Sequence, residues 1–130
     1  MKKQDITPVK MNPRIKKKWV AALRSGEYEQ GTGQLVRRIE GYEGEEDTYK
    51  FCCLGVLQNL YHEEHGTAFK PREFVREAHS AKAGQWCGLP RTSRMVDLLI
   101  TMNDGHIYGK WSGKNRKTFK QIALFIERNL

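Results

Sequence analysis

The sequence predicts a single α+β domain in which a small antiparallel sheet packs against about four helices. Three observations lead to this prediction. The chain has 130 residues, which is the length of one domain. Residues 34–52 have the pattern of two strands joined by an acidic turn, and residues 119–126 repeat apolar side chains at helical spacing. We expect residues 1–11 to form a flexible basic arm and residues 12–130 to form the domain.

The first helix is predicted from Pro13 to Arg24. Asn12 is a favourable N-cap, and a proline suits the first helical position. Ser25 and Gly26 follow the last helical residue and are expected to end the helix. Apolar residues recur on one face of this segment, while Lys16, Lys17 and Lys18 lie largely off it.

A β-hairpin and a second helix are predicted next. Residues 34–40 and 48–52 favour strands, and the acidic residues 41–47 make a loop longer than the tight two-residue turn. The second helix is expected from Cys53 to Glu64 and ends at Gly66.

The remaining elements follow from shorter signals. We expect a short helix near residues 72–79, a loop at 81–84 and a packed corner around Trp86. A helix is predicted over residues 93–101, followed by a turn at 103–105, a short strand at 106–111 and a basic loop at 112–117. Thr118 can cap the final helix, whose apolar positions are Phe119, Ile122, Ala123 and Ile126.

Charge is spread unevenly along the chain, whose formal net charge is +8. Residues 1–25 carry eight Lys and Arg against one Asp, and residues 105–130 carry six against one Glu. Residues 26–50 carry three basic residues against seven acidic ones. Basic ends on a small chain favour anionic partners such as nucleotides or nucleic acid. No apolar run is long enough to span a bilayer, so no membrane association is predicted.

The adjacent cysteines Cys52 and Cys53 are predicted where a strand hands over to a helix. A helix N-terminus favours a thiolate, so either residue is a candidate nucleophile. His79 or His106 would then act as base, with Asp104 or Asn103 orienting it. The competing interpretation, in which both cysteines are small buried core residues, is favoured. A non-enzymatic protein is therefore the preferred expectation.

Neither a disulfide framework nor a metal site is predicted. The chain has three cysteines, two of them adjacent, and it has no Cys-x-x-Cys. Reduced thiols and the lack of an apolar leader fit a cytoplasmic setting. No cofactor is expected.

A basic loop near the C-terminus is the main candidate for ligand binding. Cations there alternate with aromatic rings that can stack on a base, and the next helix offers N–H groups to a phosphate. Arg37 and Arg38 add a second basic cluster, although neighbouring strand residues point to opposite faces. The predicted loop residues are Tyr108, Lys110, Trp111, Lys114, Arg116, Lys117 and Lys120.

The sequence resembles a group of small proteins of tailed bacteriophages and prophages that are mostly hypothetical. The resemblance is carried by Lys-Trp-x-x-Ala-Leu-Arg-Ser-Gly at 18–26, Cys-Cys-Leu-Gly-Val-Leu at 52–57, Asn-Asp at 103–104 and Phe-x-x-Ile-Ala-x-x-Ile-Glu at 119–127. It covers nearly all of residues 12–130. The lysine-rich stretch at 109–117 is longer than in that group. The resemblance implies an accessory gene product that acts inside a bacterium, and it implies no catalytic residue.

Four functions are therefore expected, in descending order. The first is a phage antagonist of host defence that sequesters an anionic ligand, such as a nucleotide immune signal, in the host cytoplasm. The second is a protein-binding inhibitor of a host defence complex, similar in action to an anti-CRISPR protein. The others are a nucleic-acid binder without sequence preference and a cysteine-dependent enzyme. A homo-oligomer is compatible with each of them.

Overall fold

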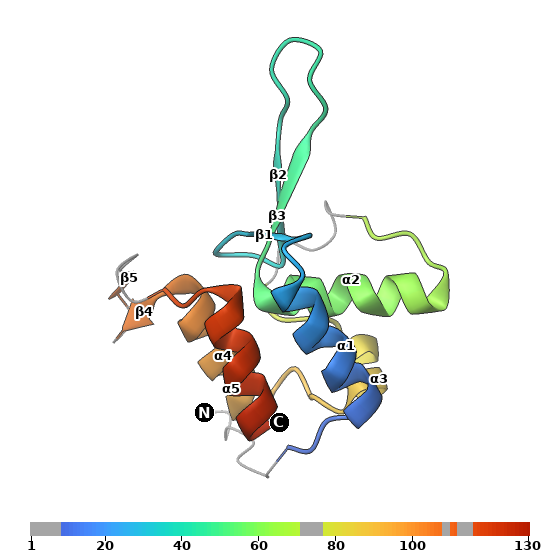
Figure 1. Ribbon diagram of the computed structural model, residues 1–130, viewed down its shortest axis with the longest axis vertical. Helices are drawn as coiled ribbons and strands as arrows, with labels where there is room; N and C mark the ends of the chain where they lie inside the picture. The colour runs from blue at the N-terminus through green and yellow to red at the C-terminus, as the bar shows by residue number, and fades with distance from the viewer. Residues whose placement is uncertain (1–8, 71–76, 108–109, 112–115) are drawn as a thin grey trace.

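The computed structural model describes residues 9–70, 77–107, 110–111 and 116–130. Along the chain these residues form α1 (Pro13–Arg24), β1 (Glu29–Gln30), β2 (Val36–Ile39), β3 (Thr48–Phe51), α2 (Cys53–His65), α3 (Ala81–Cys87), α4 (Arg94–Asp104), β4 (His106–Ile107), β5 (Lys110–Trp111) and α5 (Phe119–Asn129). The α+β class is confirmed. Figure 1 shows the helices gathered in one body and the β2–β3 hairpin projecting from it.

The core is formed where α1, α2, α4 and α5 meet. Helix α1 buries Ile15, Trp19 and Leu23, and α5 buries Ile122 and Ile126. Because these residues recur every three or four positions, each helix presents one apolar stripe to the others. The indole N–H of Trp19 donates a hydrogen bond of 2.8 Å to the carbonyl of Cys53, which ties α1 to the start of α2.

The sheet is mixed, which corrects the prediction of an antiparallel sheet. β2 and β3 pair antiparallel, as the predicted hairpin requires, while β1 lies on the other side of β3 and runs parallel to it. A strand of two polar residues has no period that the sequence could reveal. The predicted strand at 106–111 is instead two short antiparallel strands, β4 and β5.

Several helix boundaries agree with the sequence and others do not. The bounds of α1 are as predicted, and Thr118 caps α5 through a capping box with Gln121. α4 extends to Asp104, so the expected turn at 103–105 is its last turn, closed by Gly105 with φ of 80°. The described residues thus form five helices rather than about four.

The segment around α3 differs most from the prediction. Residues 81–87 were expected as a loop and a corner, but they form a helix capped by the Ser80 hydroxyl and ended by Gly88 with φ of 80°. Residues 77–80 are not helical, and the rest of the helix expected near 72–79 lies outside the described residues. Met11 is buried against the core, so the expected arm does not extend to residue 11.

Candidate functional site

The cysteine pair lies in the core rather than at an accessible site. Cys52 caps α2, and its sulfur accepts the N–H of Gly55 at 3.3 Å. Both side chains are almost fully buried. Burial raises the pKa of Cys52 to about 12 and raises the pKa of Cys53 well above its usual value. The expectation of a thiolate favoured by the helix N-terminus is therefore wrong, because loss of solvent outweighs the helix dipole.

The described residues that were predicted as catalytic partners of these thiols form hydrogen bonds with other groups. His79 is buried, and its Nε2 lies 2.6 Å from the carbonyl oxygen of Leu89. Burial lowers the pKa of His79. Asp104 is buried beside the cysteines and accepts a hydrogen bond of 2.9 Å from the amide of Asn103. The side chain of His106 lies outside the described residues. The hydrogen bonds that the structure shows at the two sulfurs are to backbone groups, since Cys52 accepts from the N–H of Gly55 and Cys53 donates to the carbonyl of Leu99.

Asn103 is the polar centre of the fold, a role that the sequence did not reveal. Its Oδ1 accepts the backbone N–H of Cys53 and the amide of Gln30, both at 3.1 Å. Its Nδ2 donates to the carbonyl of Gly31 at 2.8 Å and to Asp104. One fully buried amide thus joins α4, the start of α2 and the segment after β1. Asn103 therefore positions these segments relative to one another.

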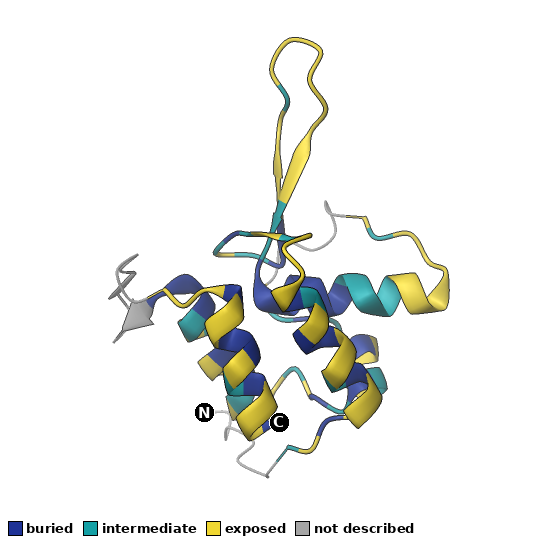
Figure 2. Ribbon diagram, viewed as in Figure 1, coloured by how far each residue is buried: buried dark blue, intermediate teal, exposed yellow. Residues whose placement is uncertain are grey.

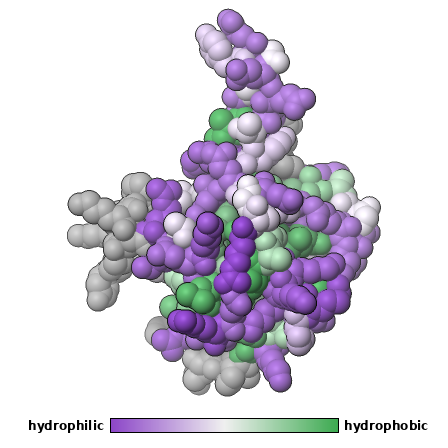
Figure 3. All heavy atoms as spheres, viewed as in Figure 1, coloured by the Kyte–Doolittle hydropathy of each residue, from purple (hydrophilic) through white to green (hydrophobic). Residues whose placement is uncertain are grey.

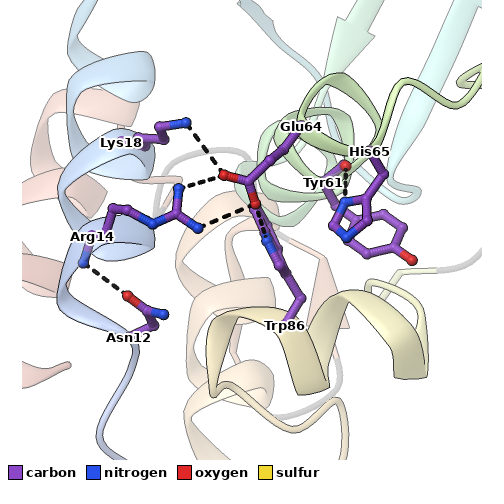
Figure 4. Close-up of polar contacts among 7 residues, drawn as sticks. All are labelled: Asn12, Arg14, Lys18, Tyr61, Glu64, His65 and Trp86. Atoms are coloured by element: carbon purple, nitrogen blue, oxygen red, sulfur yellow. Dashed lines mark hydrogen bonds and ion pairs between the residues drawn. The ribbon is translucent and has the colours of Figure 1, made fainter.

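A second polar cluster, centred on Glu64, joins α1, α2 and α3 (Figure 4). The Glu64 carboxylate accepts hydrogen bonds from Arg14 and from the indole N–H of Trp86. The Lys18 ammonium lies 3.5 Å away. The hydrogen bond from Arg14 makes the largest contribution, and the one from Trp86 the next largest, to lowering the pKa of Glu64 to about 2. The cations Arg14 and Lys18 are therefore engaged within the protein, which makes them poor candidates for holding a ligand.

The face of α1 that packs beside α5 is different, because its cations border an open groove. The groove has a volume of about 560 Å³, within the range of small-molecule sites. On the face seen in Figure 3, patches of hydrophobic surface lie between the hydrophilic side chains over these two helices. We call this feature the cationic groove, and its lining residues are Pro13, Lys16, Lys17, Val20, Ala21, Arg24 and Glu127.

The groove combines an apolar floor with a charged rim. Helical spacing places Lys17, Ala21 and Arg24 on one face of α1. Arg24 forms an ion pair with the carboxylate of Glu127, and the Lys16 ammonium donates to the Glu127 carbonyl at 3.1 Å. Within the described ranges Lys17 has no ion-pair partner, and it is exposed. Three cations against one carboxylate leave the groove positive.

The predicted ligand residues are only partly brought together. Tyr108 and Lys114 lie outside the described residues. Lys110 and Trp111 belong to β5, of which only the backbone is described. Arg116, Lys117 and Lys120 are exposed around the start of α5. Lys120 precedes Glu127 by seven residues and so shares the α5 face that borders the groove.

Arg37 and Arg38 belong to the projecting hairpin rather than to the basic surface of α5. Arg38 forms ion pairs with Glu40 at 2.9 Å and with Asp47 at 3.7 Å. Arg37 lies opposite Lys50 in the strand register. The two predicted basic clusters are therefore on separate elements, and the second one partly serves the hairpin. Sequence reasoning noted Lys16 and Lys17 but missed Arg24, because its contribution depends on how α1 packs against α5.

The described part of the chain contains neither a metal-binding cluster nor a membrane-spanning helix. No group of three or more His, Cys, Asp or Glu side chains is arranged to hold a metal ion there. None of the helices described has both the length and the apolar character needed to cross a bilayer.

The fold and the groove define a small α+β domain with a positively charged groove on its surface. A family described as a domain of unknown function, DUF8296, matches residues 11–130. The chain therefore belongs to this family. No match was found among the curated proteins or among the solved structures compared with it.

Proposed function

We propose that this protein is a non-enzymatic binding protein that holds an anionic ligand in the cationic groove. The observation that carries the proposal is the combination of Lys16, Lys17 and Arg24 with the apolar floor at Val20 and Ala21. An anion with an apolar portion can place its charge against the cations and its flat portion against the floor. A nucleotide has this chemistry.

The placement of the lysines in α1 also supports a binding role. A helix N-terminus carries partial positive charge, so cations in the first turns oppose the helix dipole. The first turn of α1 contains no acidic residue, and cations stand at positions 14 and 16–18. Arg14 and Lys18 are compensated by Glu64, whereas Lys17 has no such acid among the described residues. Lys17 opposes the dipole of α1 and so lowers the stability of the helix, and a role in binding accounts for its presence there.

The proposed biological role is sequestration of a nucleotide signal of host defence by a phage accessory protein in the host cytoplasm. Its support is the resemblance to phage and prophage proteins together with the basic ends of the chain. The buried, protonated thiols argue against the cysteine-dependent alternative.

Calorimetric titration tests the proposal. The panel contains linear nucleoside mono-, di- and triphosphates, cyclic mononucleotides and cyclic oligonucleotides. Saturable heat with one class of nucleotide, with a weaker affinity in Lys17→Glu, supports the proposal. No heat with any member contradicts it. Binding to oligonucleotides of every sequence, falling steeply with salt, would favour the nucleic-acid alternative instead.

The projecting hairpin favours a second candidate, inhibition of a host defence protein complex. A domain that extends a ribbon beyond its body can reach into a partner. Co-purification from host lysate distinguishes this function: a stoichiometric host protein supports it, and recovery of the protein alone argues against it.

A further inference from the structure

The tip of the β2–β3 hairpin is an exposed acidic surface far from the helices that form the groove. Figure 1 shows the hairpin pointing away from the body, and Figure 2 shows it exposed over most of its length. We call residues 40–47 the acidic tip; it carries five carboxylates and no cation. Tyr42 stands in this tip with 77% of its surface exposed. Tyrosine is enriched among the residues that dominate the binding energy of protein interfaces, so this ring is a candidate contact.

The tip is ordered by its own contacts before any partner binds. The N–H of Gly41 donates to the carboxylate of Asp47 at 3.0 Å, and the N–H of Glu45 donates to the carbonyl of Tyr42 at 3.1 Å. At Gly41 a Cβ would lie 2.0 Å from the carbonyl oxygen of Glu45, so only glycine fits this close approach. A preformed loop loses little entropy when it docks.

The charge of the tip is only partly neutralised within the chain. Arg38 pairs with Glu40 and Asp47. Among the residues that the structure describes, Glu43, Glu45 and Glu46 have no ion-pair partner. The tip therefore presents three free carboxylates around an exposed tyrosine.

We propose that the acidic tip of one molecule docks in the cationic groove of a second copy. The two surfaces complement each other in charge, since three free carboxylates meet the groove cations Lys16, Lys17 and Arg24. They also complement each other in polarity, because the Tyr42 ring can cover the apolar floor. The hairpin points away from α1 and α5, which carry the groove residues, in Figure 1, so the contact forms between molecules.

This association is head-to-tail, because a tip lies on one side of the contact and a groove on the other. An open assembly therefore retains one free groove at one end and one free tip at the other, unless a ring closes. The inference deepens the proposed function and rests on it, because the docked tip occupies the groove that binds the anionic ligand. Ligand and self-association therefore compete.

A charge exchange between tip and groove tests the proposal. The tip variant is Glu45→Lys/Glu46→Lys, which leaves the backbone turn at Glu43 unchanged. The groove variant is Lys16→Glu/Lys17→Glu, which adds acids near the start of α1, where the helix dipole favours them. Analytical ultracentrifugation over a wide range of concentration is the measurement, and Lys82→Glu and Glu27→Lys are controls at exposed sites outside both surfaces.

We expect the wild type and both controls to self-associate at low salt and to dissociate at high salt. Each double variant alone should associate at least ~30-fold more weakly, because like charges then meet. An equimolar mixture of the two double variants should associate again, since the unchanged tip of the groove variant fits the unchanged groove of the tip variant and the reversed tip fits the reversed groove. A wild type that stays monomeric at all concentrations, or a mixture that stays dissociated, would overturn the proposal.

The same proteins separate this inference from the proposed function. The tip variant should retain the calorimetric heat of the anionic ligand, because its groove is unchanged. If it binds ligand while the wild type shows no self-association, the proposed function stands and the inference fails. If the wild type self-associates and no ligand in the panel gives heat, the inference stands on its charge exchange and the proposed function fails.

Discussion

Replacing Lys17 by glutamate should change ligand binding and stability in opposite directions. The side chain is exposed, borders the cationic groove and follows the first turn of α1. A glutamate there faces the positive end of the helix dipole and breaks the run of three lysines at 16–18. The same charge lies against any anion held in the groove.

The magnitudes follow from these two effects. At a helix start an acid in place of a cation is worth about 0.5 kcal/mol of folding free energy, which corresponds to a rise of roughly 2 °C in Tm for a chain of this size. For the ligand, two unit charges ~4 Å apart in a water-like dielectric interact by about 1 kcal/mol, so reversing the charge of Lys17 costs about 2 kcal/mol, or roughly 30-fold in Kd.

Thermal unfolding and calorimetric titration of the same preparation measure both quantities. Lys82→Glu is the matched control, because it places an acid in the first turn of α3 and lies outside the groove. The control should gain similar stability and bind the ligand as the wild type does. A Lys17→Glu protein that binds as tightly as the wild type, or an equal loss of affinity in both variants, would refute the assignment of the groove.

Three further changes test the account of the fold. Asn103→Ala should lower the free energy of unfolding by ~3 kcal/mol in denaturant titration, because it orphans buried partners in three segments. Gly55→Ala should cost at least ~3 kcal/mol or prevent folding, as judged by circular dichroism, because the new Cβ would lie 1.8 Å from the carbonyl oxygen of Leu35. Burial lowers the pKa of His79 below the usual 6.5, so its contribution to stability is complete above that value. As the pH falls below 6.5 the unfolded chain takes up the proton first, and the unfolding free energy should decrease, whereas His79→Gln should flatten this dependence.

The Asn103 and Gly55 substitutions each have a milder counterpart in the chain. Asn129→Ala alters an exposed amide and should cost less than ~0.5 kcal/mol. Gly33→Ala meets no atom within 4 Å and should cost only ~1 kcal/mol, the penalty of its positive φ. Equal losses in each pair would mean that the burial described at Asn103 and Gly55 is wrong. A pH dependence that survives in His79→Gln would assign it to another group.

Much of the fold was predictable because its signals are local. Asn12 and Pro13 define the start of α1, Gly66 ends α2 in a left-handed conformation, and Thr118 caps α5. The hairpin was evident from two short β-prone runs around an acidic turn. In each case the residues that form the element also mark its ends.

What the sequence did not predict depends on contacts between distant segments. β1 forms because Glu29 and Gln30 pair with Lys50 and Phe51 of β3. Two residues are too few to show a strand pattern in the sequence. α3 lacks a strong apolar period, and its caps, Ser80 and Gly88, resemble ordinary loop residues. Tertiary contacts decided both elements.

The candidate site was only partly predictable for the same reason. The sequence placed lysines at 16–18 on one segment, but packing divides them. Lys18 turns toward Glu64, while Lys16 and Lys17 border α5. The cysteine pair was a candidate site because it lies at the start of a helix. Its thiols are unreactive because burial in the core raises their pKa. The sequence showed that the segment is basic, and the fold showed which of its lysines have no acidic partner among the described residues.

The proposed function requires that anions bind between α1 and α5. Heteronuclear NMR of the labelled protein, titrated with the nucleotide that gives the largest calorimetric heat, tests it most directly. Binding in the groove should give saturable shifts concentrated on the backbone amides of Lys16, Lys17, Ala21, Arg24 and Glu127, with the amides of Cys52 and Cys53 unmoved. Shifts concentrated at the start of α2, or no shifts at saturating ligand, would contradict it.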